Sequence, residues 1–219
     1  RTSMWKSSPI LRLSASVLAV CSTAAAEASA PLQEYAQRLA AGTPVRIGLY
    51  GASTYAGVWT SDGASGKIQQ GVGYWMQYFL NAYYMNAAAV VDNSAAIPGS
   101  TTNDFVTRWP GMMASTSNQI VVIGWGANDC TKMTAGEYRF NLTLMVNTAR
   151  DAGRTPILDT PHQMTAAAGT TNTESIKQFA EVMRQVARQL TVPLIDSQDW
   201  SDTLWRTNVN LRHWISDGM

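Results

Sequence analysis

The sequence predicts a three-layer α/β/α sandwich built on a five-stranded, mostly parallel sheet. Two observations lead to this fold class. Short apolar runs alternate along the chain with longer segments whose apolar residues recur at helical spacing. The short runs are apolar throughout, without the every-second-residue pattern of a half-exposed strand, which indicates strands covered on both faces. This alternation is typical of one parallel sheet between two layers of helices.

The expected elements follow one another from residue 32 onward. The predicted order is helix 32–42, strand 45–51, helix 72–84, strand 87–95, strand 119–126, helix 134–153, strand 155–161, helix 173–190 and strand 192–196. The run "QIVVIGWG" at 119–126 is the clearest strand, and Gly153 closes the helix before the fourth strand. No internal repeat or linker interrupts the pattern, so a single domain is expected.

Composition excludes several classes of protein. The chain has 219 residues, of which 46% are hydrophobic and 14% charged, and its net charge is +1. This balance fits a globular domain and offers no basic surface for nucleic acid or a membrane. No apolar run is long enough for stable membrane insertion. With two histidines and two cysteines at no metal-ligand spacing, no metal or other cofactor is expected.

Residues 1–30 are predicted to lie outside the domain, which then covers 31–219. After "RTS", the chain from Met4 has cations, a short apolar run and small residues, the pattern of a secretory signal peptide. Cleavage is expected after Ala26 or Ala30, giving a secreted or periplasmic protein. Cys21 would leave with the signal, so Cys130 is left without an internal disulfide partner.

Chemically useful residues follow the predicted strands, at the edge where parallel sheets bind their ligands. Ser53 lies in "YGASTYAG" after the first strand, and Gly99 lies in "NSAAIPGSTTNDF" after the second. Asn128 and Asp129 lie in "GWGANDC" after the third strand, and Asp217 lies in "SDGM" at the end of the chain.

These four segments, in this order, resemble the SGNH or GDSL-type hydrolase superfamily from about Val45 to the last residue. The resemblance implies an esterase whose nucleophile is Ser53. It also implies an oxyanion hole formed by the backbone N–H groups of Ser53 and Gly99 and the side-chain amide of Asn128. The family's base is a histidine three residues after an aspartate. That rule pairs Asp217 with position 220, so the chain is expected to stop one residue before its base.

Some residues depart from the family pattern or allow other interpretations. Ala52 stands where the family usually has an aspartate, which is not a reacting group. Ser53 could be a helix N-cap, Asn128 and Asp129 could favour a turn, and Asp217 could be a turn residue before glycine.

Both histidines and two aromatic residues are further candidates for the site. "DTPH" also spells the base motif with Asp159 and His162, but it follows the fourth strand, so His162 is expected to line the site. His213 is expected to pack or lie at the surface. Tyr55 and Trp125 are expected either to line the substrate site or to pack in the interior.

The sequence therefore predicts a monomeric, secreted serine esterase acting on acetyl or short-chain esters. Segments such as "GRTPILDTPH" resemble carbohydrate acetylesterases, including the rhamnogalacturonan type, so a polysaccharide ester is the first expectation. A general short-chain lipase or esterase is an alternative. Two further alternatives are a catalytically dead binding module, if the protein ends at Met219, and a flavodoxin-like cofactor-binding domain. The last would need a phosphate-cradling loop after the first strand.

Overall fold

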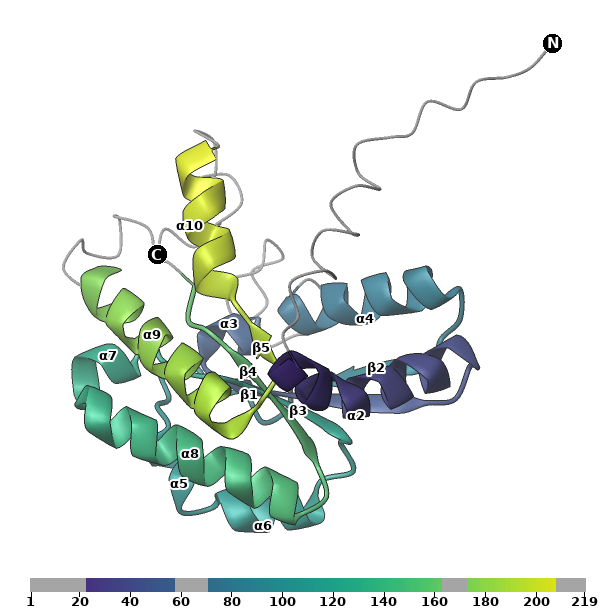
Figure 1. The fold of residues 1–219 in the computed structure, drawn as a ribbon, viewed down its shortest axis with the longest axis horizontal. Helices are drawn as coiled ribbons and strands as arrows, with labels where there is room; N and C mark the ends of the chain where they lie inside the picture. The colour runs from purple at the N-terminus through teal and green to yellow at the C-terminus, as the bar shows by residue number, and fades with distance from the viewer. Residues whose placement is uncertain (1–22, 58–70, 163–172, 208–219) are drawn as a thin grey trace.

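Within the part of the chain that the structure describes, five parallel strands form one sheet, as the sequence predicts (Figure 1). The computed structural model describes residues 23–57, 71–162 and 173–207. The strands are β1 (Val45–Gly51), β2 (Ala89–Asp92), β3 (Ile120–Gly124), β4 (Thr155–Asp159) and β5 (Leu194–Ile195). Their order across the sheet is β2-β1-β3-β4-β5, which is the doubly wound order of flavodoxin-like folds. The carboxyl ends of β1 and β3 are level, because Gly51 is the register partner of Gly124.

Helices cover both faces of the sheet. The helices are α2 (Thr23–Ala40), α3 (Ser53–Ala56), α4 (Val72–Tyr84), α5 (Asn103–Val106), α6 (Trp109–Ser115), α7 (Asp129–Lys132), α8 (Ala135–Asp151), α9 (Thr173–Leu190) and α10 (Ser197–Thr207). In Figure 1, α8 and α9 lie side by side, with α5, α6 and α7 near them. The α2 and α4 helices lie on the other face of the sheet. None of the helices described is both long and apolar enough to cross a membrane.

The α8 helix shows why the predicted helix bounds hold. Thr134 is its N-cap and forms a capping box with Glu137, in which each side chain bonds the other's backbone N–H. These bonds satisfy N–H groups that have no partner inside the helix. Beyond the far end, Gly153 has a φ of 72°, a left-handed conformation that suits glycine and stops the helix.

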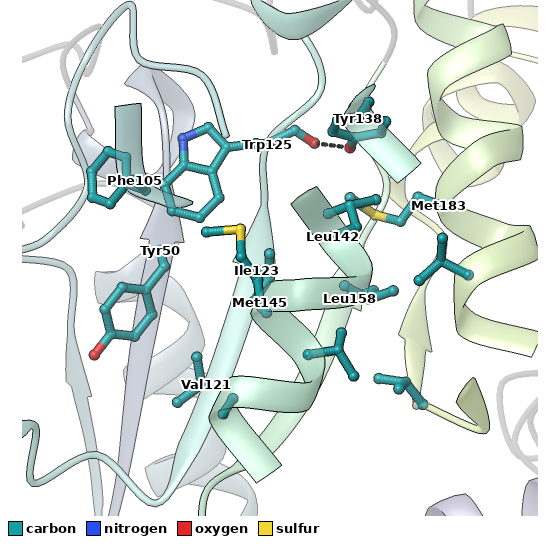
Figure 2. Packing of buried hydrophobic residues seen from close by; sticks show 14 of the residues in the cluster. Tyr50, Phe105, Val121, Ile123, Trp125, Tyr138, Leu142, Met145, Leu158 and Met183 are labelled. Carbon is teal, nitrogen blue, oxygen red and sulfur yellow. Dashed lines mark hydrogen bonds between the residues drawn. The ribbon is translucent and has the colours of Figure 1, made fainter. Parts of the chain in front are cut away.

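The larger hydrophobic core lies between the sheet and the layer of α5 to α9. Figure 2 shows the rings of Phe105, Trp125 and Tyr138 within it. The Tyr138 hydroxyl donates to the Trp125 carbonyl at 2.6 Å, and the Trp109 indole N–H donates to the Met145 carbonyl at 2.8 Å. Aromatic packing and these buried hydrogen bonds together fix the segment that follows β3.

The N-terminal helix runs through both predicted cleavage points. The α2 helix begins at Thr23 and therefore includes Ala26 and Ala30. Its packing against the smaller core cluster comes from Leu32, Tyr35 and Leu39, which all follow the predicted boundary. The division between residues 30 and 31 stays a prediction, and residues 1–22 lie outside the described part.

The α4 helix has an unusual distribution of polar and apolar residues. Its inner side carries two amides that bond the free edge of β2. Gln77 Oε1 accepts from the Val91 N–H at 2.8 Å, and Asn81 Oδ1 accepts from the Ala89 N–H, also at 2.8 Å. Its outward side exposes large apolar side chains, namely Tyr74, Trp75, Tyr78, Phe79 and Tyr83. The helix therefore satisfies the polar edge of the sheet and leaves aromatic rings outside.

Candidate active site

Ser53 stands at the sharp turn that follows β1. It is the first residue of the four-residue helix α3, and it is half-buried. Ala52, not Ser53, occupies the N-cap, so Ser53 is not the helix cap that the sequence alone allowed. Its N–H has no acceptor among the described residues, as expected in the first turn of a helix. Gly57 closes the turn with a φ of 69°.

Ser100 joins the segments that follow the first three strands. Its hydroxyl donates to the Ile97 carbonyl at 2.6 Å, and it lies 3.4 Å from the carbonyl oxygen of Gly51, two residues before Ser53. The same hydroxyl accepts from the Trp125 indole N–H at 3.0 Å. The Ser100 carbonyl accepts from the Asn128 side-chain amide at 3.0 Å. Asn128 takes part in this network directly. Gly99 precedes Ser100, and Ser53 follows Gly51 by two residues.

Gly99 lies on the exposed turn beside Ser100. Its φ of 74° falls in the left-handed region that glycine adopts without strain, and a Cβ built there would contact nothing within 4 Å. Its N–H has no acceptor among the described residues. Its carbonyl accepts from Lys132 Nζ at 2.9 Å, which ties the turn to α7. The turn therefore presents a free N–H beside an open surface.

The Asn128 side chain bonds the segment after β2 and does not cap its own helix. It occupies the N-cap of α7, yet its side chain makes no capping hydrogen bond there. Instead, one amide hydrogen goes to Ser100, and the second has no acceptor among the described residues. An amide with one donor spent on fixing its orientation and one donor spare is suited to bind a developing negative charge.

The buried carboxyl of Asp129 anchors the loop that carries Asn128. It is fully buried and accepts from the Thr102 N–H at 2.8 Å, the Thr102 hydroxyl at 2.7 Å and the Gly126 N–H at 3.0 Å. Burial raises the pKa of Asp129, and these hydrogen bonds oppose the rise. Asp129 therefore connects the turn after β2 to the turn after β3 and has no exposed surface of its own.

Tyr55 and Trp125 are inside the protein. Their side chains are 3% and 1% exposed. Trp125 packs among the rings of the larger core, whereas the Tyr55 hydroxyl donates to Asp159 at the end of β4. Of the two interpretations that the sequence allowed for these residues, the structure agrees with packing. His162 is half-buried in the segment after β4.

The remaining predicted site residues are not placed. Asp217 and His213 lie outside the described residues, as does the predicted base position. Within the part of the chain that is described, no cluster of three or more histidine, cysteine, aspartate or glutamate side chains could hold a metal. Cys130 is a free thiol whose Sγ lies 3.1 Å from the Ala127 carbonyl oxygen.

Sequence reasoning missed Ser100 and Asp159. Ser100 follows the predicted oxyanion glycine directly, and that adjacency was the available signal. The "DTPH" motif contains Asp159 but does not indicate its hydrogen bond with Tyr55. Both act through contacts between segments far apart in sequence, which no local pattern reveals.

Comparisons with known proteins show the family and the fold of this chain. Residues 49–218 match the GDSL-like lipase/acylhydrolase family. The fold is similar to that of a lipase/acylhydrolase from Enterococcus faecalis, with a TM-score of 0.61 and 24% identity over 73% of this chain and 79% of that one. It is also similar to an acetylxylan esterase from Geobacillus stearothermophilus, with a TM-score of 0.63 and 21% identity over 76% of this chain and 82% of that one.

A third similar structure is an α/β hydrolase enzyme from the metagenome of Lake Arreo, Spain. Its TM-score is 0.62 and its identity 21%, over 77% of this chain and 84% of that one. At such identities, these structures bear on the fold alone. A comparison with curated protein sequences gives no match. The family match spans most of the sheet and every predicted site segment, and the chain therefore belongs to the GDSL-like lipase/acylhydrolase family.

Proposed function

We propose that this protein is an exported serine esterase whose nucleophile is Ser53. The observation that supports this proposal most directly is the Ser100 network. It holds the side chain of Asn128 on a residue whose hydroxyl lies 3.4 Å from the carbonyl oxygen of Gly51, two residues before Ser53. Nucleophile and oxyanion donors must lie within reach of one carbonyl group, and contacts that hold the segments after β2 and β3 together support such an arrangement.

The reaction would proceed through an acyl-enzyme. The Ser53 hydroxyl attacks the carbonyl carbon while a histidine base takes its proton, and a tetrahedral oxyanion forms. Collapse breaks the ester bond, and the leaving alcohol takes the proton from the histidine. Water then attacks the acyl-enzyme with the same base, releasing the carboxylic acid and restoring the serine. The N–H groups of Ser53 and Gly99 and the spare Asn128 amide hydrogen would bind the oxyanion in both steps.

The acid–base pair belongs to the "SDGM" ending. We propose that Asp217 orients a histidine at the next position after Met219. A chain that carries this histidine is expected to be far more active than the 219-residue chain, because removing the base leaves only the contribution of the oxyanion hole and substrate binding.

An acetyl group on a polysaccharide is the proposed substrate. The similar acetylxylan esterase is the reason to test acetylated xylan first, although its low identity carries no specificity to this chain. General short-chain esters are the second candidate. Export is proposed from the signal-like pattern before residue 31.

The test is ester hydrolysis by the wild type, Ser53→Ala and Ser94→Ala, on 4-nitrophenyl acetate and on acetylated xylan. Ser94 is an exposed serine after β2 and serves as the matched control. Each variant is assayed as the 219-residue chain and as a chain extended by one histidine. We expect the extended wild type and Ser94→Ala to be active and Ser53→Ala to be inactive.

Other results would change the proposal. Equal rates for Ser53→Ala and the wild type would remove Ser53 from the mechanism. Full activity of the 219-residue chain would show that the base is another residue, such as His162. Activity on longer 4-nitrophenyl esters but not on acetylated xylan would favour the general esterase.

A further inference from the structure

Tyr55 connects the serine turn after β1 to the end of β4. Its side chain leaves α3 two residues after Ser53 and lies flat against the ends of β1 and β3. A Cβ on Gly51 would lie 2.7 Å from the Tyr55 ring, and one on Gly124 would lie 2.5 Å from it. Its carbonyl accepts from the Asn93 amide at 2.8 Å. The ring is thus fixed between the ends of two strands, and its hydroxyl reaches Asp159 on a third.

Asp159 is in turn connected to the start of α10. Ser197, the first residue of that helix, lowers the pKa of this carboxyl, whose Oδ1 has no hydrogen-bond partner among the described residues. The neighbouring Thr160 reinforces the junction, because its hydroxyl donates to Asp196 at 3.0 Å and accepts from the Gln198 N–H at 2.9 Å. In the sequence, α10 precedes Asp217. Asp159 therefore stands between the segment of the proposed nucleophile and the helix that precedes the proposed acid–base segment.

We propose that Asp159 is a positioning residue that, through Tyr55, sets the orientation of the Ser53 turn relative to α10, with a strength that depends on its own charge. An ionised carboxylate accepts a stronger hydrogen bond from a tyrosine hydroxyl than a neutral carboxyl does. The Ser53 turn is therefore held more firmly when Asp159 is charged. This inference rests on the proposed role of Ser53, but the contacts that carry it do not.

The surroundings of Asp159 place its titration in an accessible range. Burial raises the pKa of Asp159 to about 6, against the hydrogen bonds of Ser197 and Tyr55, which favour the carboxylate. Asp196 adds a like charge nearby, and Arg184 of α9 pairs with Asp196 at 2.8 Å. The charge of Asp159 also contributes to the raised pKa of Tyr138 on α8. His162, three residues along the chain, is the one other group in this segment that ordinarily titrates near neutral pH.

The test follows backbone amide resonances of Ser53 and Ser197 by NMR as pH is varied, in the wild type, Asp159→Asn and Tyr55→Phe. Both variants keep the size of the side chain, and the phenylalanine keeps the ring against Gly51 and Gly124. In the wild type, we expect both amides to shift with a midpoint near pH 6. In Asp159→Asn, both shifts should disappear. In Tyr55→Phe, Ser197 should still titrate and Ser53 should not.

Each alternative outcome contradicts the proposal. A Ser53 shift that persists in Asp159→Asn would come from another group, such as His162. A Ser53 shift unchanged in Tyr55→Phe would show that the charge of Asp159 is not transmitted through Tyr55. If the role of Asp159 were purely structural, the amide resonance of Ser53 would show no titration midpoint in the wild type or in either variant. The measurement needs no turnover, so its failure is separate from a failure of Ser53 as nucleophile.

Discussion

Ser100 illustrates how a single hydroxyl can organise a reaction site without reacting. A serine hydroxyl can donate one hydrogen bond and accept others, and Ser100 uses both abilities with partners on the segments after β2 and β3. Its carbonyl adds the contact to Asn128. The donors proposed for the oxyanion are therefore held by bonds that exist before any substrate arrives, which is the condition for electrostatic preorganisation.

Removing the Asn128 amide should affect catalysis far more than stability. In a base-containing chain, Asn128→Ala is expected to lower kcat by about 10²–10³, the usual cost of one oxyanion donor. The half-buried side chain makes one hydrogen bond, to Ser100, so the loss of stability should be about 1 kcal/mol. Steady-state kinetics and thermal unfolding measure the two effects.

Asn147→Ala is the matched control, because Asn147 is exposed on α8. It should leave kcat and stability at wild-type values. An Asn128→Ala protein with wild-type kcat would exclude this amide from the oxyanion hole.

At the scale of elements, the close approach of β1, β3 and α3 depends on two glycines, which have no side chain. The Tyr55 ring occupies the space where Cβ atoms of Gly51 and Gly124 would stand. Gly124→Ala would bring a methyl group within 2.6 Å of the ring and its hydroxyl. Because the ring is held at both ends, overpacking should lower the free energy of unfolding by about 1–3 kcal/mol.

The control for this substitution is Gly111→Ala. Gly111 lies in α6, and a Cβ there would meet nothing within 4 Å. Alanine restricts the unfolded chain and favours helix, so this variant should be more stable by about 0.4–1 kcal/mol. Urea denaturation of both variants tests the pair, and equal effects of the two substitutions would contradict the steric account.

For the whole molecule, Asp159 predicts an unusual dependence of stability on pH. Its pKa rises from 3.8 to about 6 on folding, so the native state keeps a proton that the unfolded chain has lost. The free energy of unfolding should therefore fall as pH rises through this window, by about 3 kcal/mol in total for a shift of about two units. Burial raises the pKa of Asp129 too, with the same sign.

Other carboxyls act with the opposite sign and in a more acidic range. Hydrogen bonds from Thr101 lower the pKa of Asp104, and those from Thr134 lower the pKa of Glu137. Their stabilisation is lost only as pH falls through those lowered values. Urea denaturation between pH 4 and 7 should show Asp159→Asn with a flatter profile than the wild type. Identical profiles would show that Asp159 is not the group that titrates.

Local patterns predicted much of the architecture. The predicted bounds 45–51, 72–84 and 173–190 coincide with β1, α4 and α9, because each is a continuous apolar or periodic run with clear ends. The second strand is shorter than predicted, since the polar residues after Asp92 turn away from the sheet and the Ser94 N–H bonds the Asp92 side chain.

The site was only partly predictable. Ser53, Gly99 and Asn128 are predicted because each follows a strand in a recognisable motif, and their roles stay predictions. The hydrogen bond between Tyr55 and Asp159 spans 104 positions, and no local sequence pattern around either residue indicates it. The burial of Trp125 was equally hidden, because an aromatic residue next to glycines fits a rim as well as an interior. Such facts follow from how distant segments pack.

The amides that α4 turns toward β2 also limit how copies of this protein can associate. A free strand edge can template the growth of fibrils by accepting a strand from another molecule. Here Gln77 and Asn81 already occupy the outward N–H groups of Val91 and Ala89. We therefore expect clustering on this flank to use the exposed rings of α4, and dilution or a few charged replacements there should reverse it without disturbing the sheet.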